Sequence, residues 1–369
     1  MNLADMGADV IKVERPGSGD DTRAWGPPWA GENATYYLAI NRNKRGMVLD
    51  LNDEADLRVA AELCASADVV AENFRPGYMT ERGLGPDALR ESNPRLVYLS
   101  VEAFSSDGPS AALPGYDLMI QAMSGLMHIT GSASGPPMKV GVALVDVITG
   151  LFATIAALAG LQQRSATGKG CHTEVSLFDS ALAALANQAS AVVMAGVDPI
   201  RAGNRHPSIA PYEVFDVADG TIVLAAANDK TYRLACEVLG RPDLVDDPRF
   251  VSGAARRTNV DELVAEIAPI LLTRSRQFWL EKLLEAGVPA GPINSIAEAI
   301  EWAEAMGLEP LASSPDASFR SVRSPLRFDG RRQTTCSSPP SIDEHGAQLK
   351  SAMSIKANEP RVAGGEEEL

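Results

Sequence analysis

The stretch GKGCHTEVSLFDSALAALANQ, residues 168–188, decides how this chain is expected to fold. A basic, glycine-flanked turn leads into an expected strand, Thr173 to Leu177, and Asp179 stands where that strand gives way to an apolar helix. Ligands of open α/β sheets bind in the crevice beyond the carboxyl ends of the strands. The amides at a helix start can keep a carboxylate ionised, as a nucleophile requires. Asp179 is therefore a candidate for chemistry, and its ordinary alternative role is a helix N-cap.

The first half of the chain alternates short apolar runs with helical patterns. Strands are expected at residues 8–13, 46–51, 68–71 and 96–101, and helices at 54–67, 86–92 and 143–164. Strands that alternate with helices in this way form parallel sheets with helices on both faces. The predicted fold class is α/β, with a doubly wound parallel sheet in a large domain.

The second half of the chain has a different pattern. Residues 212–228 predict a β-hairpin with Asp219-Gly220 as its turn, and amphipathic segments follow at 229–239, 258–273 and 276–287. These features indicate a smaller α+β domain. The expected organisation is a large domain over 1–200, the smaller domain over 201–310, a segment over 311–340 that returns to the large domain, and a disordered tail over 341–369.

Composition limits the class of ligand. Of the 369 residues, 45% are hydrophobic and 22% are charged, as in ordinary soluble proteins. The formal net charge of −15 argues against nucleic-acid binding, because clustered Lys and Arg are needed to neutralise phosphates. A site for any polyanion must therefore be locally basic. The first 82 residues hold basic positions such as Lys44 and Arg45, which are equally consistent with a solvated turn.

The four cysteines lie far apart and without metal-ligand spacing: Cys64, Cys171, Cys236 and Cys336. We expect unpaired thiols in a cytoplasmic protein without a metal site. The amino end shows no secretory leader pattern. The most apolar stretch, residues 140–161, carries Asp146, Gly150 and Gly160, so we expect a buried helix there rather than a membrane span.

Several ordered blocks resemble one enzyme family. They are GYDLMIQAMSGLMHITG (115–131), GPPMKVGVALVD (135–146), the Asp179 segment, GADVIKVERPGSGD (7–20), NRNKRGMVLDL (41–51), ADVVAENFRPG (67–77) and LLEAGVPAGPIN (283–294). Together they resemble the family III CoA-transferases, which include formyl-CoA and carnitine CoA-transferases and are related to the α-methylacyl-CoA racemases. The resemblance runs from Met1 to about residue 330, nearly the whole globular part.

The resemblance implies an enzyme that moves CoA from an acyl-CoA donor to a free carboxylic acid. It implies Asp179 as the nucleophile of a covalent intermediate, no metal or redox cofactor, and an interlocked homodimer. Asp117 matches an acidic residue close to the nucleophile, so it is either a supporting carboxylate or the N-cap of a helix starting near Leu118. The racemases carry a His where this chain has Tyr116, a poor base at neutral pH, and this difference favours a transferase.

The resemblance also places coenzyme A on the amino-terminal part of the chain. The implied contacts are Arg15, Leu49, Asp50, Leu51, Asn52, Asn73, Phe74, Arg75 and Arg82. A guanidinium such as that of Arg75 suits the geometry of a phosphate. A further family Arg falls on Glu81 in an ungapped match, so either Arg82 takes its place or this contact is lost.

Three features depart from the family pattern. Relatives begin with about twenty more residues, a strand and a turn that bring amides near the active site, so we expect a misassigned start codon. The usual carboxyl-terminal helix is not recognisable in the sequence. The glycine-rich loop of formyl-CoA transferase has no counterpart near 203–207, so the donor and acceptor acids stay open. The alternatives are a 2-methylacyl-CoA racemase or epimerase and a CoA-binding homologue without activity.

Overall fold

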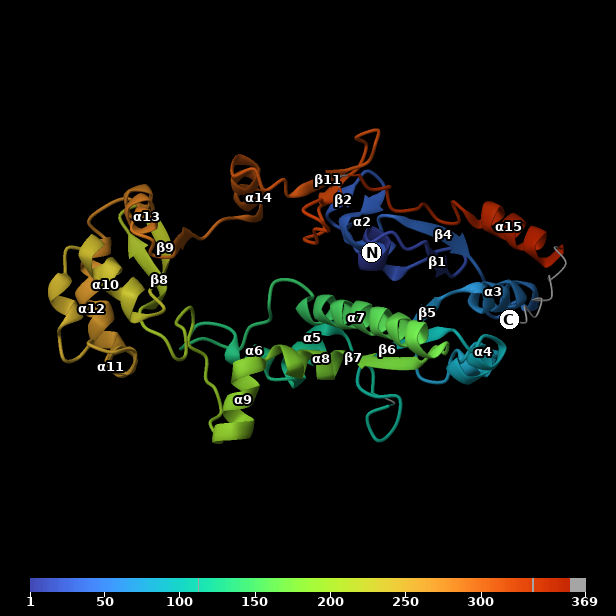
Figure 1. Cartoon of the computed structure of the whole chain (residues 1–369), viewed down its shortest axis with the longest axis horizontal. Helices are drawn as coiled ribbons and strands as arrows, with labels where there is room; N and C mark the ends of the chain where they lie inside the picture. Colours follow the sequence, from blue (N-terminus) through green and yellow to red (C-terminus); the bar gives the residue numbers. More distant parts are fainter. Residues whose placement is uncertain (112, 334, 359–369) are drawn as a thin grey trace, which may run out of the picture. The chain divides into compact units, whose positions relative to one another are not determined.

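The computed structural model describes residues 1–111, 113–333 and 335–358, which divide into two compact units (Figure 1). Unit 1 comprises residues 1–124, 141–189 and the chain from Leu308 onward, and unit 2 comprises residues 125–140 and 190–307. Residues 125–140, which were predicted to lie in the large domain, belong to unit 2. A hydrogen bond from Arg201 to the carbonyl oxygen of His128 (2.8 Å) ties them to the rest of unit 2, and one from Met138 N to Thr130 O (3.0 Å) closes the segment on itself.

The central strands of unit 1 are all parallel. β1 (Val10–Glu14) pairs with β4 (Lys44–Val48), and β5 (Val69–Glu72), β6 (Val97–Glu102) and β7 (His172–Ser176) form a second sheet in that order. The predicted parallel α/β architecture is confirmed, and each predicted strand overlaps an observed one. The five strands are divided between a two-stranded and a three-stranded sheet instead of forming one continuous sheet.

Helices and short elements surround these strands. They are α1 (Asn2–Asp5), η1 (Asp21–Ala24), β2 (Trp29–Ala30), β3 (Asn33–Ala34), α2 (Thr35–Ile40), α3 (Glu54–Ser66), η2 (Thr80–Arg82), α4 (Pro86–Ser92), α5 (Asp117–Met123), α7 (Leu144–Thr167), α8 (Leu177–Ala184), β11 (Leu311–Ser313), β12 (Arg320–Val322) and α15 (Gly346–Asn358). α3 begins where predicted because Asp53 accepts the N–H groups of Ala55 and Asp56 as an N-cap. α9 (Ala186–Ala195) spans the boundary between the two units.

The long helix α7 packs on β6 and β7 through one stripe of its surface. The buried positions recur every three or four residues: Val145, Thr149, Ala153, Ala157 and Gly160. A Cβ on Gly160 would lie 2.7 Å from Val97 Cγ1, so glycine is what allows this close approach.

The other face of α7 is apolar and exposed, at Val147, Leu151, Ile155 and Leu158. In the described part of the chain, α7 is the only single helix long and apolar enough to cross a membrane. The predicted buried helix therefore has one face against the sheet and one face open in the single chain.

Unit 2 is built on an antiparallel hairpin of β8 (Tyr212–Val217) and β9 (Gly220–Ala225), extended by β10 (Ala290–Pro292). Val217 pairs with Gly220, so Ala218 and Asp219 form the turn, one residue earlier than predicted. The N–H of Ala218 donates to the carbonyl of Arg274 at 3.0 Å, and Asp219 accepts from the N–H of Arg276 at 2.6 Å. Contacts from far along the chain therefore set the turn.

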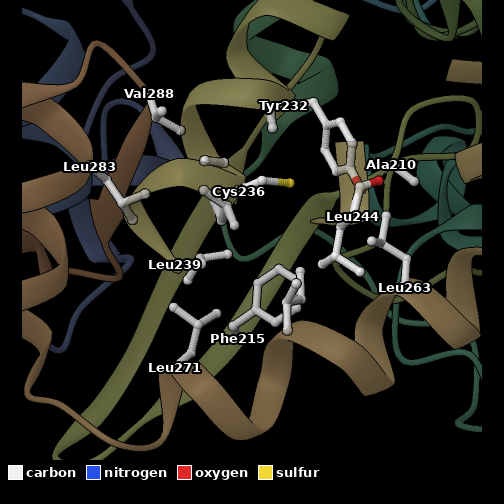
Figure 2. Close-up of a cluster of buried hydrophobic side chains, with 14 of the residues drawn as sticks. Ala210, Phe215, Tyr232, Cys236, Leu239, Leu244, Leu263, Leu271, Leu283 and Val288 are labelled. Carbon is white, nitrogen blue, oxygen red and sulfur yellow. The ribbon is translucent and has the colours of Figure 1, made fainter. Parts of the chain in front are cut away.

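Seven helices complete unit 2 among its described residues. They are α6 (Leu126–Ile129), α10 (Asp229–Val238), η3 (Pro242–Val245), α11 (Gly253–Thr258), α12 (Val260–Leu271), α13 (Arg276–Glu285) and α14 (Ile296–Ala305). Phe215 of the hairpin, Leu263 and Leu271 of α12 and Leu283 of α13 point into one buried cluster (Figure 2). This cluster gives unit 2 a hydrophobic core of its own.

The carboxyl-terminal segment corrects the prediction of a disordered tail from residue 341. α15 is formed, and its Leu349 is buried in a cluster with Met47 and Leu96. Before the helix, His345 N donates to the carbonyl of Gly46 at 3.0 Å, and Asp343 accepts the N–H of Val48 at 2.8 Å. This segment thus covers the edge of β4 that does not face β1. Residues 359–369 of the predicted tail lie outside the described residues.

Candidate active site

β7 continues directly into α8, and this junction presents Asp179. Ser176 is the N-cap of α8, since its Oγ accepts the N–H of Asp179 at 3.0 Å. The same hydroxyl donates to Asp179 Oδ2 at 2.7 Å. The N-cap role considered for Asp179 is therefore taken by Ser176, and the Asp179 side chain is exposed in the first helical turn. Its carboxylate is oriented by one hydroxyl and is open to solvent.

Two segments meet at Ala103, just after the carboxyl end of β6. Phe178 N, beside Asp179, donates to the carbonyl of Ala103 at 3.1 Å. A Cβ on Gly115 would lie 2.4 Å from Ala103 Cβ, so only glycine allows the chain to pass here. The segments that carry Asp117 and Asp179 therefore both contact the same strand end.

Asp117 caps α7 rather than its own helix. α5 begins at Asp117, and its N-cap Tyr116 makes no side-chain cap hydrogen bond. Asp117 Oδ1 instead accepts the N–H groups of Val145 (2.8 Å) and Asp146 (3.3 Å), and Gln121 donates to Oδ2 at 2.6 Å. The alternative in which Asp117 caps the helix near Leu118 is wrong, because the unpaired amides that it satisfies belong to the start of α7.

Asp146 and Tyr36 lie close enough to Asp117 for its charge to affect their pKa values. Burial, and then the charge of Asp117, raise the pKa of Asp146 above its usual range. Burial, Asp146 and Asp117 likewise raise the pKa of Tyr36. The ring of Tyr36 contacts that of Trp25 edge to face, with centroids 5.0 Å apart. Nothing local in the sequence connects Tyr36 or Trp25 with Asp117, so neither was predicted to lie near it.

Arg15 immediately follows β1 and is exposed. Its Nε donates to Ser18 Oγ at 2.9 Å, and its guanidinium pairs with Asp21. The position at the carboxyl end of a parallel strand is the one expected for a ligand contact.

The loop after β4 combines core and surface residues. Leu49 is 2% exposed and belongs to the core, so only its backbone can face a ligand. Asp50 accepts hydrogen bonds from the backbone and side chain of Asn52 at 2.9 and 3.1 Å, which holds the turn. Leu51 is half-buried and Asn52 is exposed.

The loop after β5 exposes Asn73, Phe74 and Arg75. The ring of Phe74 stacks on that of Tyr78 with centroids 4.6 Å apart. The guanidinium of Arg75 contacts both carboxylate oxygens of Glu81, at 3.1 and 2.7 Å. This loop therefore presents an aromatic face beside a guanidinium.

Arg82 connects the β4 and β5 loops. It lies over the Tyr78 ring at 3.7 Å and donates to Asn52 Oδ1 at 2.7 Å and to the carbonyl of Leu51 at 3.2 Å. Glu81 occupies the neighbouring position and is paired with Arg75. Of the two, Arg82 is therefore the residue that contacts the residue 51–52 loop.

Three comparisons with known proteins address the family. The sequence model described as CoA-transferase family III matches residues 1–346. This chain belongs to CoA-transferase family III. It is 42% identical to succinate–glutarate CoA-transferase of Agrobacterium fabrum, over 94% of this chain and 89% of that protein. It is 39% identical to acetyl-CoA:oxalate CoA-transferase of Acetobacter aceti, over 94% and 89%.

The fold of this CoA-transferase is also known from experiment in relatives. A CAIB/BAIF family protein from Brucella suis matches with a TM-score of 0.83 and 40% identity, covering 95% of this chain and 93% of that one. The predicted family, the predicted α/β fold and the prediction of an enzyme are confirmed.

A buried ionic network of this CoA-transferase was missed in the sequence. Arg23 contacts both oxygens of Glu14 at 2.8 and 2.7 Å and the hydroxyl of Tyr37 at 2.6 Å. Burial alone would raise the pKa of Glu14, but the hydrogen bonds from Arg23 and from the N–H of Asp20, together with the charges of Lys12 and Arg23, lower that pKa. Lys12 pairs with Asp20, whose pKa falls to about 2 although burial opposes the change. These contacts hold the loop between β1 and η1, which includes the exposed Arg15.

The other basic positions noted in the sequence, Lys44 and Arg45, are not in these loops. Lys44 and Arg45 begin β4 and so lie at the opposite end of that strand from the 49–52 loop. Burial and the nearby Lys12 lower the pKa of Lys44 to about 8. His128 is exposed on α6, and His206 accepts the N–H of Ser208 in a turn of unit 2. Among the described residues, no group of three His, Cys, Asp or Glu side chains is arranged to hold a metal ion.

Proposed function

We propose that this CoA-transferase moves CoA from an acyl-CoA donor to a free carboxylic acid through a covalent intermediate on Asp179. The observation that carries the proposal is the exposed carboxylate in the first turn of α8, oriented by the Ser176 hydroxyl beyond the end of a parallel strand. A nucleophile of this kind divides one difficult transfer into easier steps. No metal or redox cofactor takes part in the proposed reaction.

The proposed steps balance without an external reagent. An Asp179 oxygen attacks the thioester carbonyl, the C–S bond breaks, and an acyl–aspartyl anhydride and CoA thiolate form. The thiolate attacks the aspartyl carbonyl, which gives an aspartyl–CoA thioester and releases the donor acid. The acceptor carboxylate then attacks this thioester to form a second anhydride and thiolate. Attack of the thiolate on the acceptor acyl carbon gives the new acyl-CoA and restores Asp179.

The loops beyond β1, β4 and β5 are the proposed CoA site. Arg15, Arg75 and Arg82 would face the phosphates, because guanidinium groups match phosphate oxygens in pairs. Phe74 offers an exposed ring for a base to stack on. Asp50 holds the turn that presents Asn52, while Leu49, Leu51 and Asn73 would contribute contacts from the same loops.

Dicarboxylic acids are the proposed substrate class. The names of the Agrobacterium fabrum and Acetobacter aceti relatives refer to succinate, glutarate and oxalate. Both relatives cover nearly the whole of this chain, including the segments that carry Asp117 and Asp179. Small dicarboxylates and their CoA esters are therefore the first donors and acceptors to test.

A homodimer in the cytoplasm is the proposed working form. The exposed apolar face of α7 supports an interface with a second copy, because large contiguous apolar surfaces of soluble proteins are normally covered. All four cysteines are free thiols, in keeping with a reducing compartment.

The test is the intact mass of the protein after brief incubation with acetyl-, succinyl-, glutaryl- and oxalyl-CoA. We expect a CoA- or acyl-sized increment that hydroxylamine removes, and no increment in Asp179→Ala. Asp87→Ala is the matched control, because Asp87 is also an exposed first-turn aspartate in unit 1, on α4. An adduct that persists in Asp179→Ala contradicts the assignment. α-Proton exchange without an adduct would support a racemase, and CoA binding without an adduct an inactive homologue.

A further inference from the structure

The basic side chains proposed to receive the CoA phosphates already hold carboxylates from their own loops. Arg15 is paired with Asp21 in the segment after β1. Arg75 is paired with Glu81, six residues further along the loop after β5. All four side chains are more than half exposed, so the pairs lie on the surface rather than inside the protein.

The contact between Arg75 and Glu81 occupies the Nη1–Nη2 edge of the guanidinium, one of the edges that can receive a phosphate. Nη1 and Nη2 of Arg75 each contact one oxygen of Glu81, in the paired arrangement that a phosphate would adopt. The hydrogen bond with Arg75 lowers the pKa of Glu81, so this carboxylate is ionised at neutral pH. Glu81 is also fixed from its backbone, since its N–H donates to the carbonyl of Gly77 at 2.9 Å.

A second cation lies close to the same carboxylate. Arg82 Nη1 is 3.7 Å from Glu81 Oε2, while its Nη2 and Nε are directed at Asn52 and Leu51. Glu81 thus stands between two of the cations assigned to CoA. A phosphate that approaches the Nη1–Nη2 edge of Arg75 finds the carboxylate of Glu81 already bound there.

We infer that Glu81 and Asp21 act as internal competitors for the phosphates of CoA. Each holds part of its guanidinium in the free enzyme and must give up those donors when a phosphate binds to them. Together they set the affinity for phosphorylated ligands. This inference rests on the proposed CoA site. It makes Glu81 a determinant of affinity at a position where the family resemblance had indicated a lost or shifted arginine.

The expected size of the effect follows from the exposure of these pairs. Exposed ion pairs are weak because water and salt screen them, so removal of the competitor should tighten phosphate binding by about two- to fivefold. The same removal should leave a ligand without phosphates unaffected. Pantetheine has the thiol arm of CoA but no phosphate, which makes it the matching probe.

The experiment is titration calorimetry of the full chain with CoA and with pantetheine. The variants are Glu81→Gln, Asp21→Asn and Arg75→Ala, with Glu309→Gln as control. Glu309 is 70% exposed and paired with Arg323 at 2.9 Å, so its variant removes an equivalent surface charge outside the proposed site. We expect the Kd for CoA to fall about two- to fivefold in Glu81→Gln and in Asp21→Asn, and to rise in Arg75→Ala. Glu309→Gln should match the wild type.

The outcomes separate this inference from the proposed site. If Arg75→Ala weakens CoA binding but Glu81→Gln leaves it unchanged or weaker, Glu81 supports Arg75 and the inference is overturned alone. If Arg75→Ala binds CoA as the wild type does, or the wild type does not bind it, the proposed CoA site fails as well. If Glu309→Gln also binds CoA more tightly, the lower net negative charge of the protein explains the effect, and the inference is overturned.

Discussion

Asp117 shows how one carboxylate can be committed to structure at the edge of the candidate active site. Its two oxygens accept three hydrogen bonds, two of them from amides at the start of α7. A helix start leaves its first N–H groups without partners within the helix, and Ala143 at the start of α7 supplies no side-chain cap. Asp117, which lies on α5, accepts these N–H groups in place of a local cap. The packing of α5 against both α7 and α8 therefore accounts for its capping role and for its position near the Asp179 segment.

Removal of this cap should destabilise the protein measurably. We expect Asp117→Ala to lower the free energy of unfolding by about 1 kcal/mol, the usual cost of losing an N-cap, with a smaller loss in Asp117→Asn. Urea unfolding of the two variants checks this, with Asp87→Ala as control. Equal stability of Asp117→Ala and wild type would show that water replaces the cap at no cost.

Asp146 should make stability depend on pH. Because burial and Asp117 raise its pKa in the folded protein above 3.8, the folded state holds this proton more tightly than the unfolded state. Its contribution is therefore present below the unfolded pKa and is lost as the pH rises through the folded pKa. Asp146→Asn has no carboxyl group to ionise at this position, so the variant does not lose this stability as the pH rises. We expect the variant to be more stable than wild type at pH about 7, by less than about 1 kcal/mol, and not at pH about 3. Urea titrations at both pH values test it, and a variant less stable at neutral pH contradicts it.

The sequence predicted the position of Asp179 but not its environment. A strand, an aspartate and an apolar helix in direct succession are visible locally, and the structure has them within one residue of the expected positions. The cap that Asp117 provides joins residues 28 apart, and the contact of Gly115 with Ala103 depends on the packing of two segments. No local pattern predicts such contacts. The contact between Arg75 and Glu81 was not predicted, because a family arginine aligns with position 81 and Glu81 was therefore interpreted only as a lost or shifted phosphate contact.

At the scale of elements, regular periodicity was enough to find α3, α4 and α7, whereas α15 was missed. Its polar and apolar residues are mixed with little amphipathic pattern, and the polar residues around and after it dominated the prediction. α15 is held by Leu349 in the core, by the ion pair of Lys350 with Asp56 at 3.2 Å, and by the contacts of Asp343 and His345 with the edge of β4. An element that depends on tertiary contacts rather than on its own pattern is the kind that sequence reasoning fails to find.

Leu349 should therefore determine whether α15 stays docked. We expect Leu349→Ala to cost about 2–4 kcal/mol, because Leu349 is 4% exposed and packs with the core that includes Met47. Ser351→Ala, at an exposed position of the same helix, is the control. Thermal unfolding gives the stability, and amide exchange at residues 46–48 reports whether the β4 edge opens. Unchanged stability in Leu349→Ala would mean that α15 contributes little to the fold.

At the scale of the whole molecule, α7 buries only one of its two apolar faces within the single chain. Its sheet-facing stripe is made of small residues, while Leu151 and Ile155 on the other face are 49% and 59% exposed. A chain with a net charge of −15 has ample polar residues to cover a solvent-facing helix, so apolar residues there indicate a covered surface. A second copy is the occupant that we propose for this face.

The oligomeric state tests that proposal. We expect the wild-type protein to have the mass of a dimer in light scattering coupled to gel filtration, and Leu151→Glu with Ile155→Glu to shift it toward the monomer. Burying two carboxylates in an apolar interface carries a large desolvation penalty. Gln162→Glu is the control, because it adds a charge at an exposed polar position of the same helix. Circular dichroism separates dissociation from unfolding, since both changed positions face away from the sheet. A double variant that remains dimeric would show that the second copy binds elsewhere, and a monomeric wild type would remove the proposed dimer altogether.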